Sequence, residues 1–371
     1  MRSGLLISTR ALTGIAIDPS RGVATVAAGA RWGEVVAEAA KHGLAPITGS
    51  SPLVGVTGFL LGGGIGPLAR SHGFGSDYLI GARVVLASGD VVQVDSSTRP
   101  ELLWALRGGK PAIGVITELT LKLVPLRTLY AGSLYFEERH LESAFRAWID
   151  WTARADPRVT SSAALAKFPP FDAIPPELRG RRLLVLRFTF PGEAREGAQL
   201  AAALRAFAPV YVDALGEMPI TDIARIHNDP TQPTAVWVSG LMLDRVDQDF
   251  ATVMLEAFDP ERGSPFPVGE LRLIGEATRR DVPGGSAVGG RDAGFVLGYL
   301  GFDPAPFERV LPEASQQLIE RTARWRSPVT NSNFIGEAEH LVSAWAPATS
   351  ARLREIERAV DPHGMFKPPS A

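Results

Sequence analysis

Cysteine is absent from the 371 residues of this chain. Without thiols, the sequence excludes a disulfide framework, a thiolate metal site, a cysteine nucleophile and a cysteinyl link to a cofactor. Histidine is scarce as well. The six histidines are scattered, with no pair four residues apart and no His-Glu-x-x-His motif. We therefore expect no metal site.

The sequence also lacks an excess of charge of either sign. Lys and Arg number 38 against 40 Asp and Glu, which gives a net charge of −2. Such a balance provides no broad field for attracting nucleic acid or an anionic membrane. The longest apolar runs, such as residues 84–87, are far too short to span a bilayer, and no signal peptide is visible. We expect a cytoplasmic protein that binds a small molecule.

The length predicts two domains, and the hydrophobic periodicity predicts an α+β fold. Expected strands cover residues 5–8, 15–17, 23–27, 82–87, 91–94, 113–124, 130–136, 182–190, 210–214, 234–242, 270–274 and 294–300. Expected helices cover residues 31–42, 100–106, 141–153, 193–208, 247–258, 307–325 and 349–360. Beyond Pro125, strands alternate with helices, which indicates one sheet covered on one face by helices.

The first expected strand, Leu5–Ser8, stands at the start of the sequence with no lead-in. A strand needs a hydrogen-bonded partner, and its natural partner would lie upstream. We therefore expect Met1 to be a misassigned start, with an in-frame extension before it.

The segment of greatest chemical interest is Pro46–Gly66, PITGSSPLVGVTGFLLGGGIG. Its seven glycines allow the main chain to approach a ligand closely and to donate several N–H groups to phosphate or carbonyl oxygens. Ser50, Ser51 and Thr57 add hydroxyl groups. No Lys-Ser/Thr follows the glycines, so the segment is not a Walker loop. Because no strand leads into it and no helix is expected to leave it, it is also a poor dinucleotide fingerprint.

Several motifs, taken in order, resemble the second half of the FAD-binding domain of bacterial-type berberine bridge enzyme-like oxidases. These oxidases are flavoproteins of the vanillyl-alcohol-oxidase, or PCMH, type. The motifs are AAGARWGEV (27–35), HGLAPITGSSP (42–52), GVTGFLLGGGIG (55–66), GSDYLIGARVVLASGDVV (75–92), PELLWALRGG (100–109) and GVITELTLKLVP (114–125). Asn333-Phe334 and residues 361–366 resemble the C-terminal return of that family to the flavin domain.

The resemblance implies a partial PCMH-type FAD-binding domain over residues 1–125. It further implies a substrate domain over 126–328, with an antiparallel sheet covered by helices, and a returning segment over 329–371. The expected cofactor is FAD, contacted by Gly49, Ser50, Ser51, Gly55, Thr57, Gly58, Gly62, Gly63, Gly64, Ile65, Gly66, Val115, Ile116 and Asn333. Flavin would accept a hydride from an alcohol, sugar or secondary-metabolite carbon, with O2 as one candidate electron acceptor.

The sequence departs from this family at four places in the flavin region. The opening Gly-Gly-His-Ser-type loop has no counterpart, and Ser51 replaces the cysteine that many members bond to flavin. The usual Gly-Gly-Asn-Phe-Gly run is altered by Lys110 and Pro111, and Pro111 lacks a backbone donor. Asn331 stands where relatives often have a tyrosine that can act as a base, and an amide cannot take a proton. We therefore expect non-covalent flavin and assign no catalytic residue.

In the second domain, Glu276 and Arg291 either face the substrate or form a solvated pair at a sheet edge. Of these two arrangements we expect the solvated pair. His227 reads as part of a turn that closes a helix, and His72 as a packing or capping residue. Two functions stay open: an FAD-dependent oxidoreductase, and a truncated, inactive remnant that no longer binds FAD. The colour of the purified protein distinguishes them.

Overall fold

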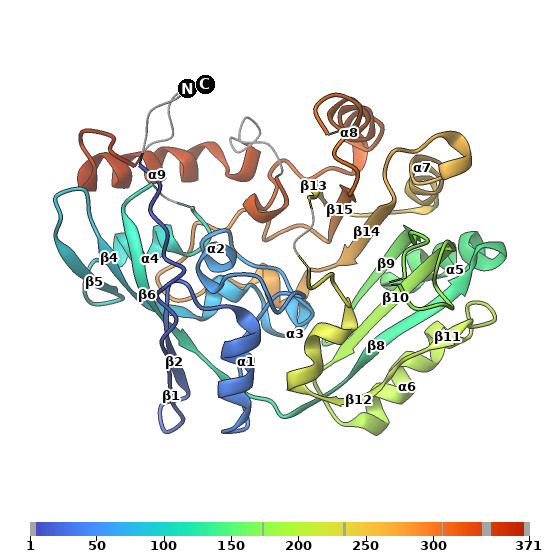
Figure 1. Cartoon of the computed structure of the whole chain (residues 1–371), viewed down its shortest axis with the longest axis horizontal. Helices are drawn as coiled ribbons and strands as arrows, with labels where there is room; N and C mark the ends of the chain where they lie inside the picture. Colours follow the sequence, from blue (N-terminus) through green and yellow to red (C-terminus); the bar gives the residue numbers. More distant parts are fainter. Residues whose placement is uncertain are drawn as a thin grey trace.

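Two antiparallel sheets stand side by side in the computed structural model, which describes residues 5–110, 112–172, 174–232, 235–305, 307–335 and 343–366. In Figure 1 the N-terminal sheet lies at the left and the larger sheet at the right, with the glycine-rich segment between them. Within the described residues, no helix is both long and apolar enough to cross a membrane.

The first sheet has the order β1-β2-β6-β4-β5. Its strands are β1 (Ile15–Asp18), β2 (Val23–Ala27), β4 (Leu79–Val85), β5 (Val91–Asp95) and β6 (Val115–Lys122). Helices α1 (Trp32–Ala40), α2 (Val56–Leu61), α4 (Pro100–Leu106) and α9 (Pro347–Val360) contribute buried side chains to the same hydrophobic core. In Figure 1, α9 from the C-terminal part of the chain lies over this sheet. Residues far apart in sequence therefore build one core.

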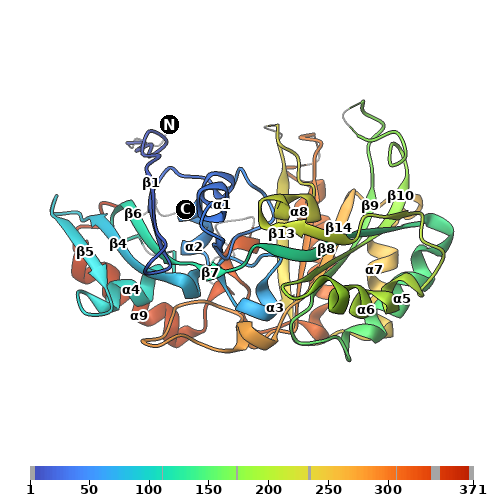
Figure 2. The same cartoon turned by 90° about the horizontal axis from the view of Figure 1, so that it is seen from below.

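The second sheet is larger, with the order β11-β8-β10-β9-β14-β15-β13 and β12 paired to β8. Its strands are β8 (Thr128–Glu137), β9 (Thr160–Lys167), β10 (Arg182–Phe190), β11 (Val212–Asp213), β12 (Gly216–Pro219), β13 (Trp237–Leu243), β14 (Val268–Leu273) and β15 (Phe295–Gly301). One face packs its apolar side chains against α5 (Glu138–Thr152), α6 (Ala194–Arg205), α7 (Gln248–Ala257) and α8 (Val310–Arg321). Figure 2 shows helices α5, α6 and α7 gathered on the same side of the strands.

Short elements join the two sheets. The strands β3 (Leu44–Ala45) and β7 (Val124–Pro125) pair with each other near the crossover between the sheets. The remaining short elements are α3 (Ala69–His72), η1 (Gly75–Tyr78), η2 (Ile220–Ile226), η3 (Pro260–Arg262), η4 (Glu276–Arg279), η5 (Ala323–Trp325) and η6 (Ser332–Phe334). Contacts between α3 and η4 and between α1 and η2 place these elements at the junction of the two sheets.

The structure corrects the sequence prediction in three places. Leu5–Ser8 is not a strand, because it has no ladder partner among the described residues. The strand β9 was missed because TSSAALAK is rich in alanine and serine, which have no strong β-propensity, although seven of its eight residues are buried. The expected helix 307–325 is shorter, since α8 ends at Arg321. The expected strand start at Thr234 lies outside the described residues.

Candidate functional site

The glycine-rich segment 46–66 connects α1 to α3 and contains a helix that the sequence did not predict. This helix, α2, begins after Gly55 and ends at Leu61. Val56 N–H donates to Ala30 O, and the Thr57 hydroxyl donates to Ala28 O at 3.0 Å. These bonds fix the helix against the connection between β2 and α1. The segment is therefore an ordered part of the first core.

Five of its glycines are required by packing of protein against protein. A Cβ on Gly49 or Gly64 would collide with the Phe59 ring, and one on Gly62 would overlap the Asn333 side chain. A Cβ on Gly63 would approach Asn331, and one on Gly66 would overlap the backbone carbonyl of Thr48. Only Gly55 and Gly58 of the segment have no atom within 4 Å of an added Cβ. The main chain is thus open to a ligand at the start of α2.

The hydroxyl groups of this segment also have protein partners. Ser50 Oγ donates to Asp229 Oδ2 at 2.6 Å, which ties the segment to the loop after η2. Ser51 Oγ accepts from Leu53 N–H at 3.4 Å. Gly49, Ser50 and Ser51 nevertheless line a cavity of ≈ 50 Å³ that opens between α1 and η2. This cavity is the second place where the segment offers surface to a ligand.

Asn333 lies against the glycine segment. Its neighbour Ser332 contacts Gly62, although 270 residues separate these two in the sequence. The amide nitrogen of Asn333 donates to Phe59 O at 2.8 Å. Asn331 caps the short helix η6, because its Oδ1 accepts from Asn333 N–H at 3.1 Å. Its own Nδ2 is buried and has no hydrogen-bond partner within the described part of the chain. The C-terminal segment thus reaches the glycine segment by direct contact.

The altered loop after α4 approaches the same place. Lys110 adopts a positive φ of 42°, and its Nζ donates to Ser332 O at 3.1 Å. Burial lowers the pKa of Lys110. Pro111 lies outside the described residues. Of the two residues expected on β6, Ile116 is buried in the first core, and Val115 is partly exposed.

Facing the glycine segment, the second sheet carries a buried polar cluster that the sequence analysis missed. On β10, β9 and β14, residues Arg187, Ser162 and Arg272 stand opposite one another in register. Glu270 lies two residues before Arg272 on β14, so both point to the same face. The helices pack on the opposite face. The signal was present as Arg187 inside the largely apolar strand β10 and as Glu270 and Arg272 inside β14.

Glu270 holds this cluster together. Its Oε1 accepts from Ser162 Oγ at 2.6 Å and from Arg187 Nη1 at 2.9 Å. Its Oε2 lies 2.7 Å from Arg272 Nη2. Burial alone would raise the pKa of Glu270, but Arg272 and Arg187 overcome this and hold the pKa well below its usual range. Glu270 is therefore ionised at neutral pH.

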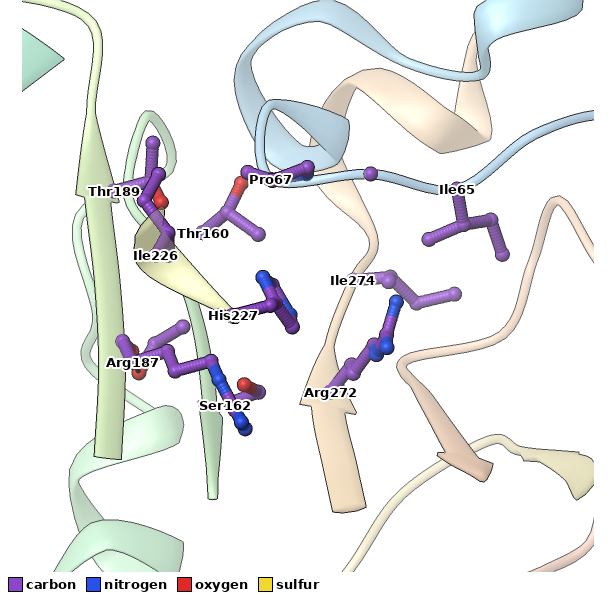
Figure 3. Close-up of a pocket in the computed structure, with 12 residues that line it drawn as sticks. Ile65, Pro67, Thr160, Ser162, Arg187, Thr189, Ile226, His227, Arg272 and Ile274 are labelled. Atoms are coloured by element: carbon purple, nitrogen blue, oxygen red, sulfur yellow. Dashed lines mark hydrogen bonds between the residues drawn. The ribbon is translucent and has the colours of Figure 1, made fainter. Parts of the chain in front are cut away.

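His227 enters the cluster from the loop after η2, and Figure 3 shows it between Arg187 and Arg272. Its side chain is 7% exposed. Nε2 lies 3.3 Å from Glu270 Oε1, yet neither ring nitrogen makes a well-aligned hydrogen bond with any residue that the structure describes. Burial lowers the pKa of His227 against the opposing attraction of Glu270, so the ring is neutral at neutral pH.

A cavity links this cluster to the glycine segment. It has a volume of ≈ 20 Å³ and lies between the sheet face and Ile65, Gly66 and Pro67. A cavity of this size holds about one water-sized group. His227 and the two arginines line it. The end of the predicted cofactor segment and the polar face of the second sheet thus meet at one small pocket.

The other charged residues considered in the second domain are structural. Arg291 pairs with Asp77 in a buried ion pair and with Asp281 at 3.2 Å, so the two sheets are joined there. Glu276 lies 3.6 Å from the buried guanidinium of Arg70. The expected sheet-edge pair of Glu276 and Arg291 is wrong, because each has a partner elsewhere. His72 is partly buried, with Nδ1 2.8 Å from Ser71 Oγ.

Comparison with known proteins gives the family. The profile of an FAD binding domain family matches residues 1–95. The chain is 27% identical to (R)-6-hydroxynicotine oxidase of Paenarthrobacter nicotinovorans over 98% of its own length and 80% of that protein. It is 26% identical to an uncharacterised FAD-linked oxidoreductase of Bacillus subtilis, YgaK, over 99% and 81% of the two chains.

The chain is an FAD-linked oxidoreductase with a PCMH-type FAD-binding fold. Its fold agrees, since the BBE-like 1 structure of Physcomitrella patens superposes with a TM-score of 0.82 at 17% identity, over 97% of this chain and 79% of the other. The predicted fold, the predicted enzyme class and the predicted cofactor FAD are thereby confirmed. Which residues of this FAD-linked oxidoreductase contact the cofactor stays a prediction.

Proposed function

We propose that this oxidoreductase oxidises a carbon of a small organic molecule, with flavin bound non-covalently between the glycine segment and the second sheet. Bound FAD would supply the hydride acceptor, and the protein would supply orientation and electrostatics. The observation that carries the proposal is the junction of Ile65 and Gly66 with the polar face around His227 in one cavity. The flavin and the reacting carbon would lie beside this cavity, which itself holds only about one water-sized group.

The residues that we propose to hold FAD are of two kinds. The open main chain at Gly55 and Gly58 suits a close approach by a phosphate or ring oxygen, since no side chain stands over it. The cavity of Gly49, Ser50 and Ser51 offers a second contact surface. Gly62, Gly63, Gly64, Gly66 and Asn333 would act by shaping the segment, because their contacts are with other protein atoms.

We propose non-covalent attachment because the side chains described in this region offer no thiol to bond flavin. Ser51 stands at the position of the flavin-linked cysteine of relatives, and the chain has no cysteine. A serine hydroxyl at this position can donate or accept a hydrogen bond. We propose O2 as the electron acceptor, in line with the oxidase named among its relatives.

The test uses the purified protein as isolated. We expect visible absorption bands of oxidised flavin, and release of all the flavin into the supernatant after acid precipitation. Addition of an oxidisable substrate in air should then produce hydrogen peroxide. Protein that is colourless and stays so after incubation with FAD would contradict the proposal and favour the inactive remnant. Flavin that remains with the acid precipitate would contradict non-covalent binding alone.

A further inference from the structure

The cluster around His227 carries more positive than negative charge. Arg187 and Arg272 both line the cavity, and His227 beside them is neutral. Glu270, which pairs with both arginines, is not among the residues that line it. The two arginines and Glu270 therefore leave one positive charge without a counter-charge among the residues of the cluster that the structure describes. Neighbouring charges are engaged elsewhere: Arg70 with Glu276 and Ile274 O, and Asp229 with Ser50.

Hydrogen-bond donors in the cluster are also unused. Among the described residues, neither Nε of Arg187 nor the single N–H of the neutral His227 ring has an acceptor, although these atoms are buried. Buried donors without partners are costly, and native proteins rarely retain them without a reason. A ligand that accepts hydrogen bonds and carries one negative charge would satisfy both the donors and the charge.

The dimensions of the cavity restrict that ligand. A volume of ≈ 20 Å³ admits a small group and excludes a ring. The strand residues Thr160 and Ser162 form part of its wall, and Gly66 and Pro67 close it on the side of the glycine segment. A group held here would leave the rest of the molecule directed along the glycine segment.

We propose that this cavity binds a carboxylate of the substrate, so that the enzyme oxidises a small organic acid. Arg187 and His227 donate to the carboxylate oxygens, and Arg272 adds positive charge. Glu270 is a positioning residue, since it contacts both arginines and holds them in place. The proposal deepens the function proposed above and rests on it for the reaction, although binding of a carboxylate can be measured separately.

The experiment titrates the purified protein with acetate and with its neutral isostere acetamide, at constant ionic strength, by calorimetry. We expect acetate to bind at least tenfold more tightly than acetamide or chloride. Equal affinity for acetate and acetamide would overturn the proposal. Phosphate or sulfate binding as tightly as acetate would also overturn it, because the site would then be a general anion site.

Three variants locate the binding. In Arg187→Gln and His227→Leu, we expect acetate affinity to fall at least tenfold. Arg182→Gln is the matched control: Arg182 lies on the same strand but pairs with Asp259 at 3.1 Å, and we expect unchanged affinity. Wild-type affinity in both cavity variants would refute the site. The melting temperature of His227→Leu tests whether this variant folds. It should not fall, because leucine replaces a buried polar group that has no partner among the described residues.

The two proposals can fail independently. Protein that binds acetate as expected but takes up no FAD would retain the carboxylate site and lose the oxidoreductase reaction. Protein that binds FAD, and whose flavin is reduced equally well by neutral alcohols and by their carboxylic acid counterparts, would retain the reaction and lose the carboxylate site.

Discussion

Glycines in the segment 46–66 have two different structural roles. At Gly66 the backbone carbonyl of Thr48 occupies the space of a side chain, whereas at Gly58 that space is open. Folding therefore requires glycine at position 66, whereas packing within the protein does not require it at position 58. A pair of identical substitutions at these positions separates packing from cofactor contact.

We expect Gly66→Ala to reduce the free energy of unfolding by roughly 1–3 kcal/mol, because a backbone atom cannot move aside cheaply. Gly58→Ala, in a helix, should be neutral or stabilising by about 0.5–1 kcal/mol. The same Gly58 variant should weaken FAD binding. Urea unfolding and flavin titration measure the two effects. Equal stability of the two variants would contradict the assigned roles.

At the scale of elements, the two strands β10 and β14 place apolar residues toward the helices and charged residues toward the glycine segment. The alternation follows from the period of two along a strand. Arg187, Glu270 and Arg272 therefore meet only because β9 lies between β10 and β14. A sequence reading that omits β9 does not bring them together.

Another link between elements is the buried ion pair of Asp77, in η1, with Arg291, before β15. Asp77 also accepts from Phe74 N–H at 3.0 Å. We expect Asp77→Asn to reduce the free energy of unfolding by about 3 kcal/mol, because the buried Arg291 loses its buried carboxylate partner and keeps only the half-exposed Asp281. Glu137→Gln, which removes a partner of the exposed Arg139, should cost at most about 1 kcal/mol. Similar losses in thermal unfolding of both variants would contradict a special role for the Asp77 pair.

At the scale of the whole molecule, stability should depend on pH through the buried histidines. Burial lowers the pKa of His227 and of His72. The unfolded chain takes up protons on histidine near pH 6.5, while the folded chain keeps these two rings neutral at that pH. With respect to these two rings, the free energy of unfolding is therefore highest above pH 6.5, and it decreases as the pH falls below 6.5.

We expect the free energy of unfolding to decrease between pH 7.5 and pH 5.5, by up to about 1.4 kcal/mol per pH unit for each such histidine. His227→Leu should show a shallower decrease than the wild type in urea unfolding at several pH values. His42→Gln, at an exposed position, serves as the control and should keep the wild-type slope. An unchanged slope in His227→Leu would show that this ring is not buried neutral.

Much of the molecule follows from local sequence. Helix α4 is found at the predicted residues, and the hairpin of β4 and β5 follows from apolar runs around Ser88-Gly89-Asp90. The order of glycine-rich motifs indicates an FAD-binding domain, because such motifs are contiguous in the chain. Local signals of this kind need no knowledge of distant residues.

Tertiary structure alone decided the composition of the polar pocket. His227 belongs to a turn in the sequence, and only the packing of the loop after η2 against β14 brings its ring within 3.3 Å of Glu270. The glycines likewise indicate close approach, but the sequence does not show whether protein or ligand makes it. Burial and charge at a site depend on which distant segments meet there, and that is fixed only when both sheets have folded and met.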